Sequence, residues 1–362
     1  MKIITIIGAR PQFIKSAAIS KAVLEYSAQH PKAPVEEIIV HTGQHYDANM
    51  SGVFFEQMNI PKPKYQLNIN GLSHGAMTGQ MLEAIEKILI NEQPQWVLVH
   101  GDTNSTLAGA LAARKLHIKV AHIEAGLRSF NERMPEEANR ILTDRMSTLL
   151  FVPTDSAIEN LKKEGYDYIG TKVVKNGDVM LDASLVFTPF AKKPSDNLPE
   201  NFILSTIHRA ENTDDPKRLN GIFNALNKIA EKDAIVIPLH PRTKSFIEKY
   251  AITLHKNIFC IEPVGYLEML YLLNNCTLVM TDSGGLQKEA FFFKKFCLTM
   301  RDDTEWVELV NNGYNTLVGA DTDKIIAAYT SAGNTSLDFS KNLYGTGDAS
   351  QKIIDGLVNF TN

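Results

Sequence analysis

Three acidic residues in the first half of the chain could supply an acid and a base to one site. Asp102 follows the apolar stretch 96–100, Glu124 follows the apolar stretch 119–123, and Glu136 opens a helical pattern. Carboxylates held in different environments can act as acid and base on one substrate. Each also has an ordinary explanation, because Asp102 could cap a helix, Glu124 could be a satisfied buried acid, and Glu136 could form a surface ion pair. Their common place at expected strand ends and a helix start favours a shared catalytic role.

Basic residues near these positions could hold the carboxylates or an anion. Arg10 lies in the turn after the first apolar stretch, Lys15 lies about one helical turn further on, and Arg140 follows Glu136 by four residues on the same helix face. Each cation taken alone is as often a solvated side chain as a ligand. The turn at 8–13 lacks the G-x-G-x-x-G pattern of a dinucleotide site, so a nicotinamide cofactor loses its main support.

A turn in the second half of the chain has the composition of an anion site. Residues 281–289 read Thr-Asp-Ser-Gly-Gly-Leu-Gln-Lys-Glu and connect an apolar stretch to a helical pattern. Ser283, Gly284 and Gly285 would let the N–H groups of a helix N-terminus approach a phosphate, because no Cβ of a glycine blocks the way. Glu289, one to two turns into the helix, could accept hydrogen bonds from a ribose. The alternative is a plain capped turn, since Asp and Ser are common N-caps.

Other polar residues follow the expected strands of the second half. His208 comes after the first of these strands, Tyr266 after the third and Arg301 after the fifth. A histidine and an arginine beside a Gly-Gly turn suit a diphosphate, and the region of Tyr266 could face a base. Tyr266 could equally be a packing aromatic, and Arg301 could belong to a capped helix start.

Apolar stretches alternate with helical patterns along the whole chain. They lie at 3–7, 37–40, 96–100, 119–123, 149–152 and 173–175, then at 202–207, 234–239, 258–261, 277–280, 296–300 and 316–318. This alternation is typical of parallel sheets covered by helices, which bind ligands at the carboxyl ends of their strands. Because the segment 191–200 is interpreted as a linker, we expect an α/β protein with doubly wound domains at 1–190 and 191–362 and a cleft between them. The last helical stretch, 349–360, could pack on either domain.

Composition argues against several classes of protein. The 362 residues carry a formal net charge of −4, so nothing favours nucleic acid or an anionic membrane as a partner. No apolar stretch approaches a membrane span and the first residues lack signal-peptide features, so a cytoplasmic protein is expected. Cys260, Cys276 and Cys297 lack metal-type spacing and are expected to be buried thiols. His100 and His122 are expected to be core histidines, and no catalytic metal is predicted.

Taken in order, the motifs resemble the non-hydrolysing UDP-N-acetylglucosamine 2-epimerase family. The shared phrases are G-A-R-P-x-x-I-K, H-G-D-T, H-x-E-A-G-L-R, P-E-E-x-N-R, H-R-x-E-N, H-P-R and T-D-S-G-G-x-Q-x-E-A, spread from residue 2 to about 319. An ordered set of this kind is far more specific than any one motif. The resemblance implies a GT-B fold, two Rossmann-like domains with the nucleotide of a UDP-sugar in the cleft, no cofactor, and usually a homodimer.

The resemblance also implies a mechanism and roles for residues. Such enzymes eliminate UDP to leave a glycal and then add UDP back, with C2 protonated on the other face. The essential carboxylates and their supporting cations correspond to Asp102, Glu124, Glu136, Lys15 and Arg140. The clamp for the departing diphosphate corresponds to His208, Arg10, Ser283, Gly284 and Gly285, and the ribose contact to Glu289. Which carboxylate serves as base in the forward direction stays open.

Four phrases favour the branch of the family that acts on UDP-2,3-diacetamido-2,3-dideoxy-glucuronic acid, a precursor of bacterial surface polysaccharide such as O-antigen. They lie at 6–13, 44–50, 210–214 and 304–308. A carboxylate at C6 of such a sugar would need a further cation. The candidates in the sequence are Arg128, Arg133 and Arg301.

Three alternatives stay open at this point. A hydrolysing epimerase would differ only in whether water captures the glycal. A GT-B glycosyltransferase would share the fold and the nucleotide clamp, but it needs an acceptor site and at most one base. A non-catalytic nucleotide-sugar sensor is disfavoured because every charged position of the family motifs is kept.

The resemblance generates a prediction about regulation. Family members that are activated by their own substrate carry a second arginine after the His-Arg pair, where this chain has Ala210. Their allosteric site also uses the segment matched here by Gln44 and His45. Because the arginine is missing, we predict little cooperativity, so initial rates should follow a hyperbola in substrate concentration. A sigmoidal curve that disappears in a Gln44→Ala variant would contradict this prediction.

Overall fold

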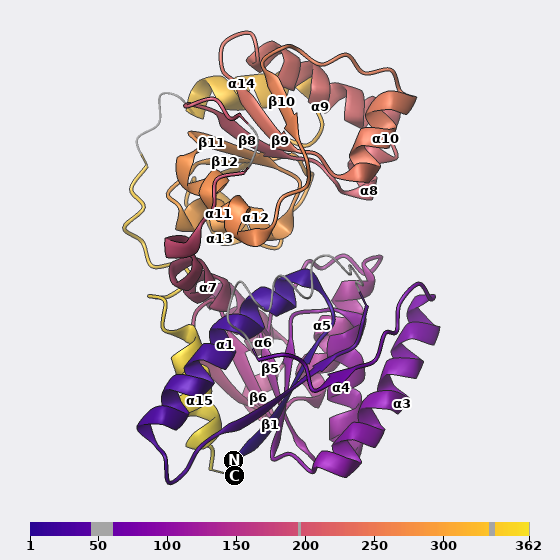
Figure 1. Cartoon of the computed structure of the whole chain (residues 1–362), viewed down its shortest axis with the longest axis vertical. Coiled ribbons are helices and arrows are strands. Elements are labelled where there is room, and N and C mark those ends of the chain that lie inside the picture. The colour runs from indigo at the N-terminus through magenta and orange to yellow at the C-terminus, as the bar shows by residue number, and fades with distance from the viewer. Residues whose placement is uncertain (45–60, 195–196, 333–336, 362) are drawn as a thin grey trace. The chain divides into compact units, whose positions relative to one another are not determined.

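The structure is a computed structural model, and it describes residues 1–44, 61–194, 197–332 and 337–361. The chain forms two units, each with its own sheet (Figure 1). The first unit comprises Met1–Val186 together with Asn342–Asn362, and the second comprises Phe187–Lys341. His45, which the sequence matched to an allosteric segment, lies outside the described residues.

The first unit is organised around a parallel sheet of seven strands in the order β3-β2-β1-β4-β5-β6-β7. Its elements are β1 (Lys2–Ile7), α1 (Arg10–Gln29), β2 (Glu36–His41), β3 (Tyr65–Gln66), α3 (His74–Glu92), β4 (Trp96–His100), α4 (Asn104–Lys115), β5 (Lys119–Ile123), α5 (Pro135–Met146), β6 (Leu149–Val152), α6 (Asp155–Lys163), β7 (Lys172–Lys175), α7 (Val179–Phe187) and α15 (Ala349–Val358). The chain runs outward from β1 to β3 and restarts at β4 on the other side of β1. The loops after β1 and β4 therefore meet at the switch point where such sheets bind ligands.

The central strands of this sheet are continuous apolar stretches because helices cover both of its faces. Val97, Leu98 and Val99 of β4 are all 0% exposed. Right-handed crossovers place α3, α4 and α5 in a row on one face and α1 beside α15 on the other (Figure 1). α15 is tied down by Asp182 of α7, whose carboxylate accepts hydrogen bonds from Ala349 N at 3.2 Å and Ser350 N at 2.6 Å.

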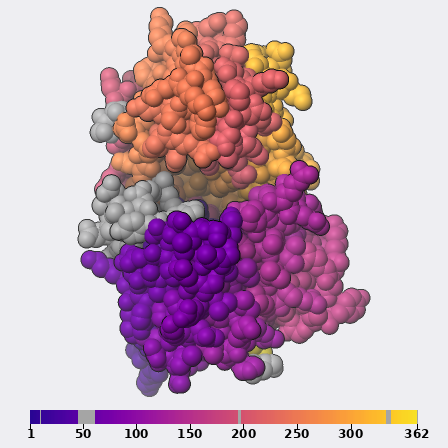
Figure 2. All heavy atoms as spheres, turned by 90° about the vertical axis from the view of Figure 1, so that its right-hand side faces the viewer, coloured from indigo at the N-terminus to yellow at the C-terminus, as the bar shows by residue number. Residues whose placement is uncertain are grey.

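α3 shows how a helix of this unit divides between core and surface. Its buried residues are Met81, Ile85, Ile88 and Leu89, which recur at helical spacing and pack against the sheet. The opposite side of α3 belongs to the surface that faces the viewer in Figure 2. Within the described ranges, none of the helices combines the length and the apolar character that crossing a membrane requires.

The second unit is organised around a parallel sheet of six strands in the order β10-β9-β8-β11-β12-β13. Its elements are β8 (Ile203–Thr206), α8 (Ala210–Thr213), α9 (Pro216–Ile229), β9 (Ile235–Pro238), α10 (Pro241–Lys249), β10 (Ile258–Ile261), α11 (Tyr266–Asn275), β11 (Leu278–Thr281), α12 (Gly284–Phe292), β12 (Cys297–Thr299), α13 (Val307–Asn311), β13 (Asn315–Leu317) and α14 (Thr322–Ala332). Successive residues of β8 enter different cores, with Ile203 in one cluster and Leu204 in the other. The switch point lies between β8 and β11.

The predicted fold class is confirmed, because both units are doubly wound parallel sheets. Two details differ from expectation. The two-residue strand β3 was not predicted, since so short a strand leaves no periodicity to detect. The expectation of three buried thiols is wrong for Cys260, which is exposed, while Cys276 and Cys297 are buried. Cys260 lies on β10, at the edge of its sheet, where one side of the strand has no neighbour.

His100, the last residue of β4, is a core histidine as expected. Its side chain is 0% exposed, and neither ring nitrogen has a hydrogen-bond partner among the described residues. Burial in an apolar surrounding, reinforced by the nearby charge of Lys15, lowers the pKa of His100 to about 3. The ring is therefore neutral in the folded protein at ordinary pH.

This buried ring predicts a loss of stability in mild acid. An unfolded His100 binds a proton below about pH 6.5, whereas the folded residue does so only near its pKa of about 3. Protonation thus favours the unfolded chain, and the free energy of unfolding should fall as the pH drops from about 6.5 towards 3, by up to about 1.4 kcal/mol per pH unit. In His100→Leu this contribution should be absent. Urea denaturation at a series of pH values tests this, and equal slopes for the two proteins would contradict it.

Candidate active site

Gln12 joins the two loops that meet at the switch point of the first unit. Its Oε1 accepts hydrogen bonds from Gly8 N at 2.8 Å and Ala9 N at 3.0 Å, and its Nε2 donates to His100 O at 2.7 Å. The turn after β1 is thereby fixed to the end of β4. We did not predict this role, although a glutamine at the third position of a helix is a known sign of a capping box.

Lys15 and Glu124 form an ion pair at this edge of the sheet. Lys15 projects from α1 and is 7% exposed, and Glu124 is the first residue after β5. Glu124 has a φ of +69°, a left-handed conformation that is uncommon for a residue with a side chain. Backbone strain of this kind concentrates at functional sites. The structure therefore brings together two of the predicted residues in a special geometry.

Arg140 of α5 holds Asp102, the second predicted carboxylate. Its Nε and Nη2 donate to Asp102 Oδ2 at 3.0 and 2.7 Å, and its Nη1 donates to Glu137 Oε2 at 2.6 Å. The neighbouring Asn139 donates to the backbone oxygen of Asp102 at 2.8 Å. Asp102 does not cap α4, since the N-cap is Thr103. Glu137 was missed, because the spacing of four residues favoured Glu136 as the partner of Arg140.

The surroundings of Asp102 favour its protonated form. Burial raises the pKa of Asp102, and the negative charge of Glu124 acts in the same direction, while Arg140 and Lys15 oppose the shift. About a third of the Asp102 side chain, 32%, nevertheless remains exposed, so a ligand can reach it. Glu124 and Asp102 are thus neighbouring carboxylates with different partners, an arrangement that allows one to act as acid and the other as base.

For two predicted residues of the first unit, Glu136 and Arg10, the described part of the structure shows no side-chain contact that supports a role in the site. Glu136 lies half-buried in the first turn of α5, and no hydrogen bond or ion pair to its carboxylate exists among the described residues. The suggested ion pair of Glu136 with Arg140 is not formed. Arg10 begins α1, but its side chain lies outside the described ones. Of the three predicted carboxylates, the structure therefore brings Asp102 and Glu124 together.

In the second unit, Asp282 organises the loops after β8 and β11. Its buried carboxylate accepts hydrogen bonds from His208 N at 3.0 Å, Arg209 N at 3.0 Å and Asn212 Nδ2 at 3.2 Å. These bonds leave the imidazole of His208 exposed, with 43% of its side chain accessible. The sequence suggested Asp282 only as a possible N-cap, whereas the N-cap of α12 is Ser283.

The N-terminus of α12 is open on one side. Gly285 is exposed, and a Cβ built there would meet no atom within 4 Å. At Gly284 a Cβ would lie 2.4 Å from Glu305 Oε1, so the end of the Glu305 side chain would have to move to admit one. Although burial alone would disfavour its charge, the pKa of Glu305 is held below its usual value by Arg301 and Arg209. Free N–H groups at a helix N-terminus with cations nearby suit an anion.

The remaining predicted residues of the second unit are buried. Glu289 is 7% exposed on α12. Tyr266 is 4% exposed and meets Phe187 edge to face with ring centroids 6.4 Å apart, which agrees with its alternative as a packing aromatic. Arg301 is 1% exposed, and its guanidinium donates to Glu305 at 2.9 Å and Asp303 at 3.1 Å.

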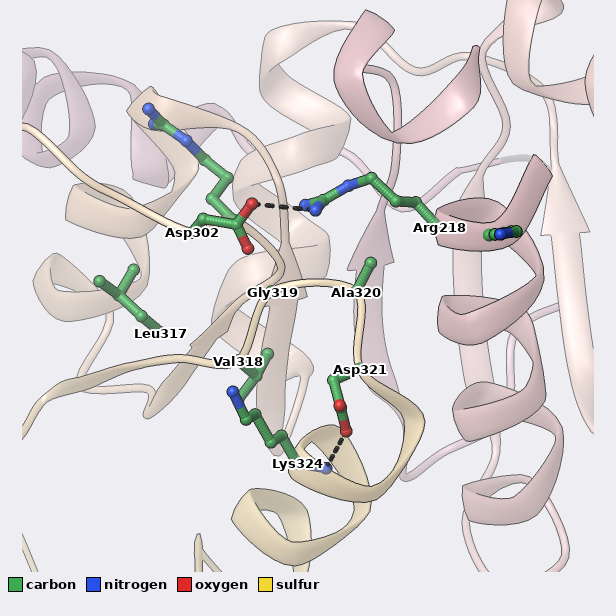
Figure 3. A pocket seen from close by; sticks show the side chains of 10 residues that line it. Arg218, Asp302, Leu317, Val318, Gly319, Ala320, Asp321 and Lys324 are labelled. Atoms are coloured by element: carbon green, nitrogen blue, oxygen red, sulfur yellow. Dashed lines mark hydrogen bonds and ion pairs between the residues drawn. The ribbon is translucent and has the colours of Figure 1, made fainter. Parts of the chain in front are cut away.

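A separate hollow of about 500 Å³ opens on the second unit between the starts of α9 and α14 (Figure 3). Arg218 and Asp302 face each other across it and form an ion pair of 2.9 Å. Lys217, Asp321 and Lys324 also line it. Of the residues predicted for the site, Arg301 alone contributes to this lining, so the hollow is distinct from the open N-terminus of α12.

Comparison with known proteins identifies the family. The family model described as UDP-N-acetylglucosamine 2-epimerase matches residues 28–358. The UDP-2,3-diacetamido-2,3-dideoxy-D-glucuronate 2-epimerase of Pseudomonas aeruginosa is 58% identical over 361 residues, covering 99% of both chains. The UDP-N-acetylglucosamine 2-epimerase of Escherichia coli K12 is 34% identical over 387 residues, covering 99% of both.

Solved structures agree with these sequence matches. The UDP-GlcNAc 2-epimerase of Methanocaldococcus jannaschii, solved in complex with UDP-GlcNAc and UDP, is 43% identical with a TM-score of 0.89, and the match covers 99% of this chain and 100% of that one. The Neisseria meningitidis enzyme, bound to UDP-GlcNAc, is 30% identical with a TM-score of 0.85 and the same coverage. The chain therefore belongs to the UDP-N-acetylglucosamine 2-epimerase family.

Proposed function

We propose that this protein is a non-hydrolysing 2-epimerase that interconverts the gluco and manno forms of UDP-2,3-diacetamido-2,3-dideoxy-glucuronic acid. The observation that carries the proposal is the 58% identity, over 99% of both chains, to an enzyme named for this substrate. The paired carboxylates Asp102 and Glu124 supply the acid–base groups that such a reaction needs.

The chemistry follows from the weak acidity of the proton at C2 of such a sugar. A base removes this proton while the bond from C1 to the diphosphate oxygen breaks, which leaves a glycal with a C1–C2 double bond and UDP beside it. The oxygen of UDP then attacks C1 again, and an acid delivers a proton to C2 from the opposite face. No atom is gained or lost, so UDP must stay bound throughout.

The residues of the first unit suit the proton transfers. Glu124 forms an ion pair with Lys15, whereas Asp102 lies in surroundings that raise its pKa. One carboxylate can therefore accept a proton while the other gives one up, and the roles exchange in the reverse direction. Glu136, which has no partner among the described residues, adds a third acid on the neighbouring helix.

The second unit suits the leaving group. In this proposal the N–H groups of Gly284 and Gly285 at the start of α12, capped by Ser283, receive the diphosphate. The exposed imidazole of His208 adds a hydrogen-bonding group beside this helix end, and Glu289 receives the ribose. A clamp of this type stabilises the charge that develops on the departing oxygen.

The C6 carboxylate of the proposed substrate requires one more cation, and the sequence offers three candidates. Arg128 is 5% exposed and paired with Asp144 and Glu164, and Arg301 is 1% exposed and paired within its own loop. Arg133 is exposed, and its guanidinium has no partner among the described residues. It precedes Glu136 by three residues, so we assign the C6 carboxylate to Arg133.

The family resemblance further supports a homodimer that works in the cytoplasm and feeds the synthesis of a surface polysaccharide. These are parts of the proposal. Size-exclusion chromatography with light scattering measures the oligomeric state directly, and a monomer at micromolar concentration would contradict the dimer.

Proton NMR in deuterated water tests the reaction itself. The purified protein should introduce deuterium at C2 of UDP-2,3-diacetamido-2,3-dideoxy-glucuronic acid and yield a manno product that is still attached to UDP. Release of free UDP with a reducing manno sugar would favour a hydrolysing enzyme instead. Recovery of the sugar unlabelled and unchanged, with UDP-GlcNAc equally inert, would contradict the epimerase proposal.

The assignment of Arg133 gives a sharper prediction. In Arg133→Ala, kcat/KM for the C6-carboxylated sugar should fall roughly 10- to 100-fold, because a hydrogen bond between charged groups is lost. The value for UDP-GlcNAc, which has no carboxylate, should change by less than about threefold. Arg114→Ala is the matched control, since Arg114 is an exposed arginine in the last turn of α4. An equal loss with both sugars would contradict the assignment.

A further inference from the structure

A buried histidine lies behind the two carboxylates and bonds at both ends of its ring. His122, on β5, is 0% exposed. Its Nδ1 lies 2.6 Å from Asp144 Oδ1 on α5, and its Nε2 lies 2.7 Å from Gly101 O at the end of β4. Both partners accept hydrogen bonds, so the ring donates from both nitrogens and joins a helix to a neighbouring strand end.

Asp144 extends this connection to the loop after β5. Its Oδ2 accepts hydrogen bonds from Gly126 N at 3.1 Å and from the guanidinium of Arg128 at 2.8 Å. Arg128 in turn donates to Glu164 through Nε at 2.6 Å and Nη2 at 2.8 Å. The buried Arg128 therefore holds the Asp144 side of the pair, and the Nε2 of His122 on the other side contacts Gly101 O.

The backbone that this pair holds is the backbone that carries the catalytic carboxylates. Gly101, Glu124 and Gly126 all have left-handed conformations, with φ of +63°, +69° and +77°. Gly101 directly precedes Asp102, and the peptide groups of Gly101 and Gly126 bond to His122 and Asp144 respectively. Glu124 also approaches Gly101, since a Cβ built on this glycine would lie 3.4 Å from Glu124 Oε2.

We infer that His122 is a positioning residue, whose hydrogen bond from Nε2 to Gly101 O sets the Gly101–Asp102 peptide so that Asp102 faces Glu124 across the reacting carbon. The inference rests on the proposed function of these carboxylates. Arg140 and Asn139 hold Asp102 from the side of α5. His122 supplies the contact from the side of the sheet, and its loss would let the peptide rotate.

The two ends of the ring can be separated by substitution. In His122→Gln the amide nitrogen reaches the place of Nε2, so the bond to Gly101 O is kept and the bond to Asp144 is lost. In His122→Asn the shorter side chain reaches the place of Nδ1, so the bond to Asp144 is kept and the bond to Gly101 O is lost. Both variants remove the same ring from the same buried place.

The inference predicts unequal effects on turnover. In His122→Asn, kcat for epimerisation should fall about 10- to 100-fold, because a displacement of about 1 Å at a reacting group costs this much. KM should stay within about threefold, since His122 touches no substrate. In His122→Gln, kcat should stay within about fivefold of the wild type. The two variants should nevertheless melt at similar temperatures, because both remove the same buried ring. Glu164→Gln, which removes the charge and one acceptor from the outermost contact of Arg128, is the control and should keep the wild-type kcat.

The outcomes distinguish this inference from the proposed function. Wild-type protein that epimerises neither sugar would contradict the function and the positioning role together. Active wild-type protein with equal losses of kcat in the asparagine and glutamine variants, or with losses that follow only the melting temperature, would leave the function standing and overturn the role of His122. A kcat for His122→Asn within about twofold of the wild type would overturn it as well.

Discussion

The first unit depends on the pairing of charges at the carboxyl edge of an apolar sheet. Glu124 and Asp102 follow strands that are almost completely buried, and a carboxylate placed there without a partner would be costly. Lys15 pairs with Glu124 and Arg140 pairs with Asp102, and each ion pair offsets part of this cost. The two cations come from different helices, Lys15 from α1 and Arg140 from α5, so each carboxylate is held by its own helix.

Much of the surrounding structure serves this pairing. Gln12 fixes the turn after β1, from which α1 carries Lys15 to its place. α5 carries Arg140 together with Asn139 and Asp144, so one helix contacts the loops after both β4 and β5. The left-handed Glu124 lies between two anchored residues, since Ile123 O accepts a hydrogen bond from Gly101 N and Ala125 N donates to Phe151 O. In the second unit a buried carboxylate is also satisfied by donors, but these are backbone N–H groups and not cations. Asp282, which is close in sequence to the open helix end at Gly285, accepts hydrogen bonds from His208 N and Arg209 N.

The sequence predicted the sheets well because parallel strands that are buried on both faces leave continuous apolar stretches, and the positions after these stretches led to Asp102, Glu124 and Ser283. It did not predict the connections between them. His122 and Asp144 are 22 residues apart in the chain, and nothing local in the sequence shows that they touch. The partner of Arg140 was expected at a spacing of four residues and is found at three, because the helix turns Glu137 inward and leaves Glu136 partly exposed. Cys260 was misjudged since an edge strand has the same apolar composition as a central one.

The central claim is that Asp102 and Glu124 act on one carbon atom of a UDP-sugar. A crystal structure of the protein with UDP-2,3-diacetamido-2,3-dideoxy-glucuronic acid bound tests it most directly. The account predicts that C2 of the sugar lies within about 4 Å of both carboxylates, which is the range required for proton transfer in a productive complex. A sugar ring bound in an ordered way with C2 more than about 6 Å from both would contradict it.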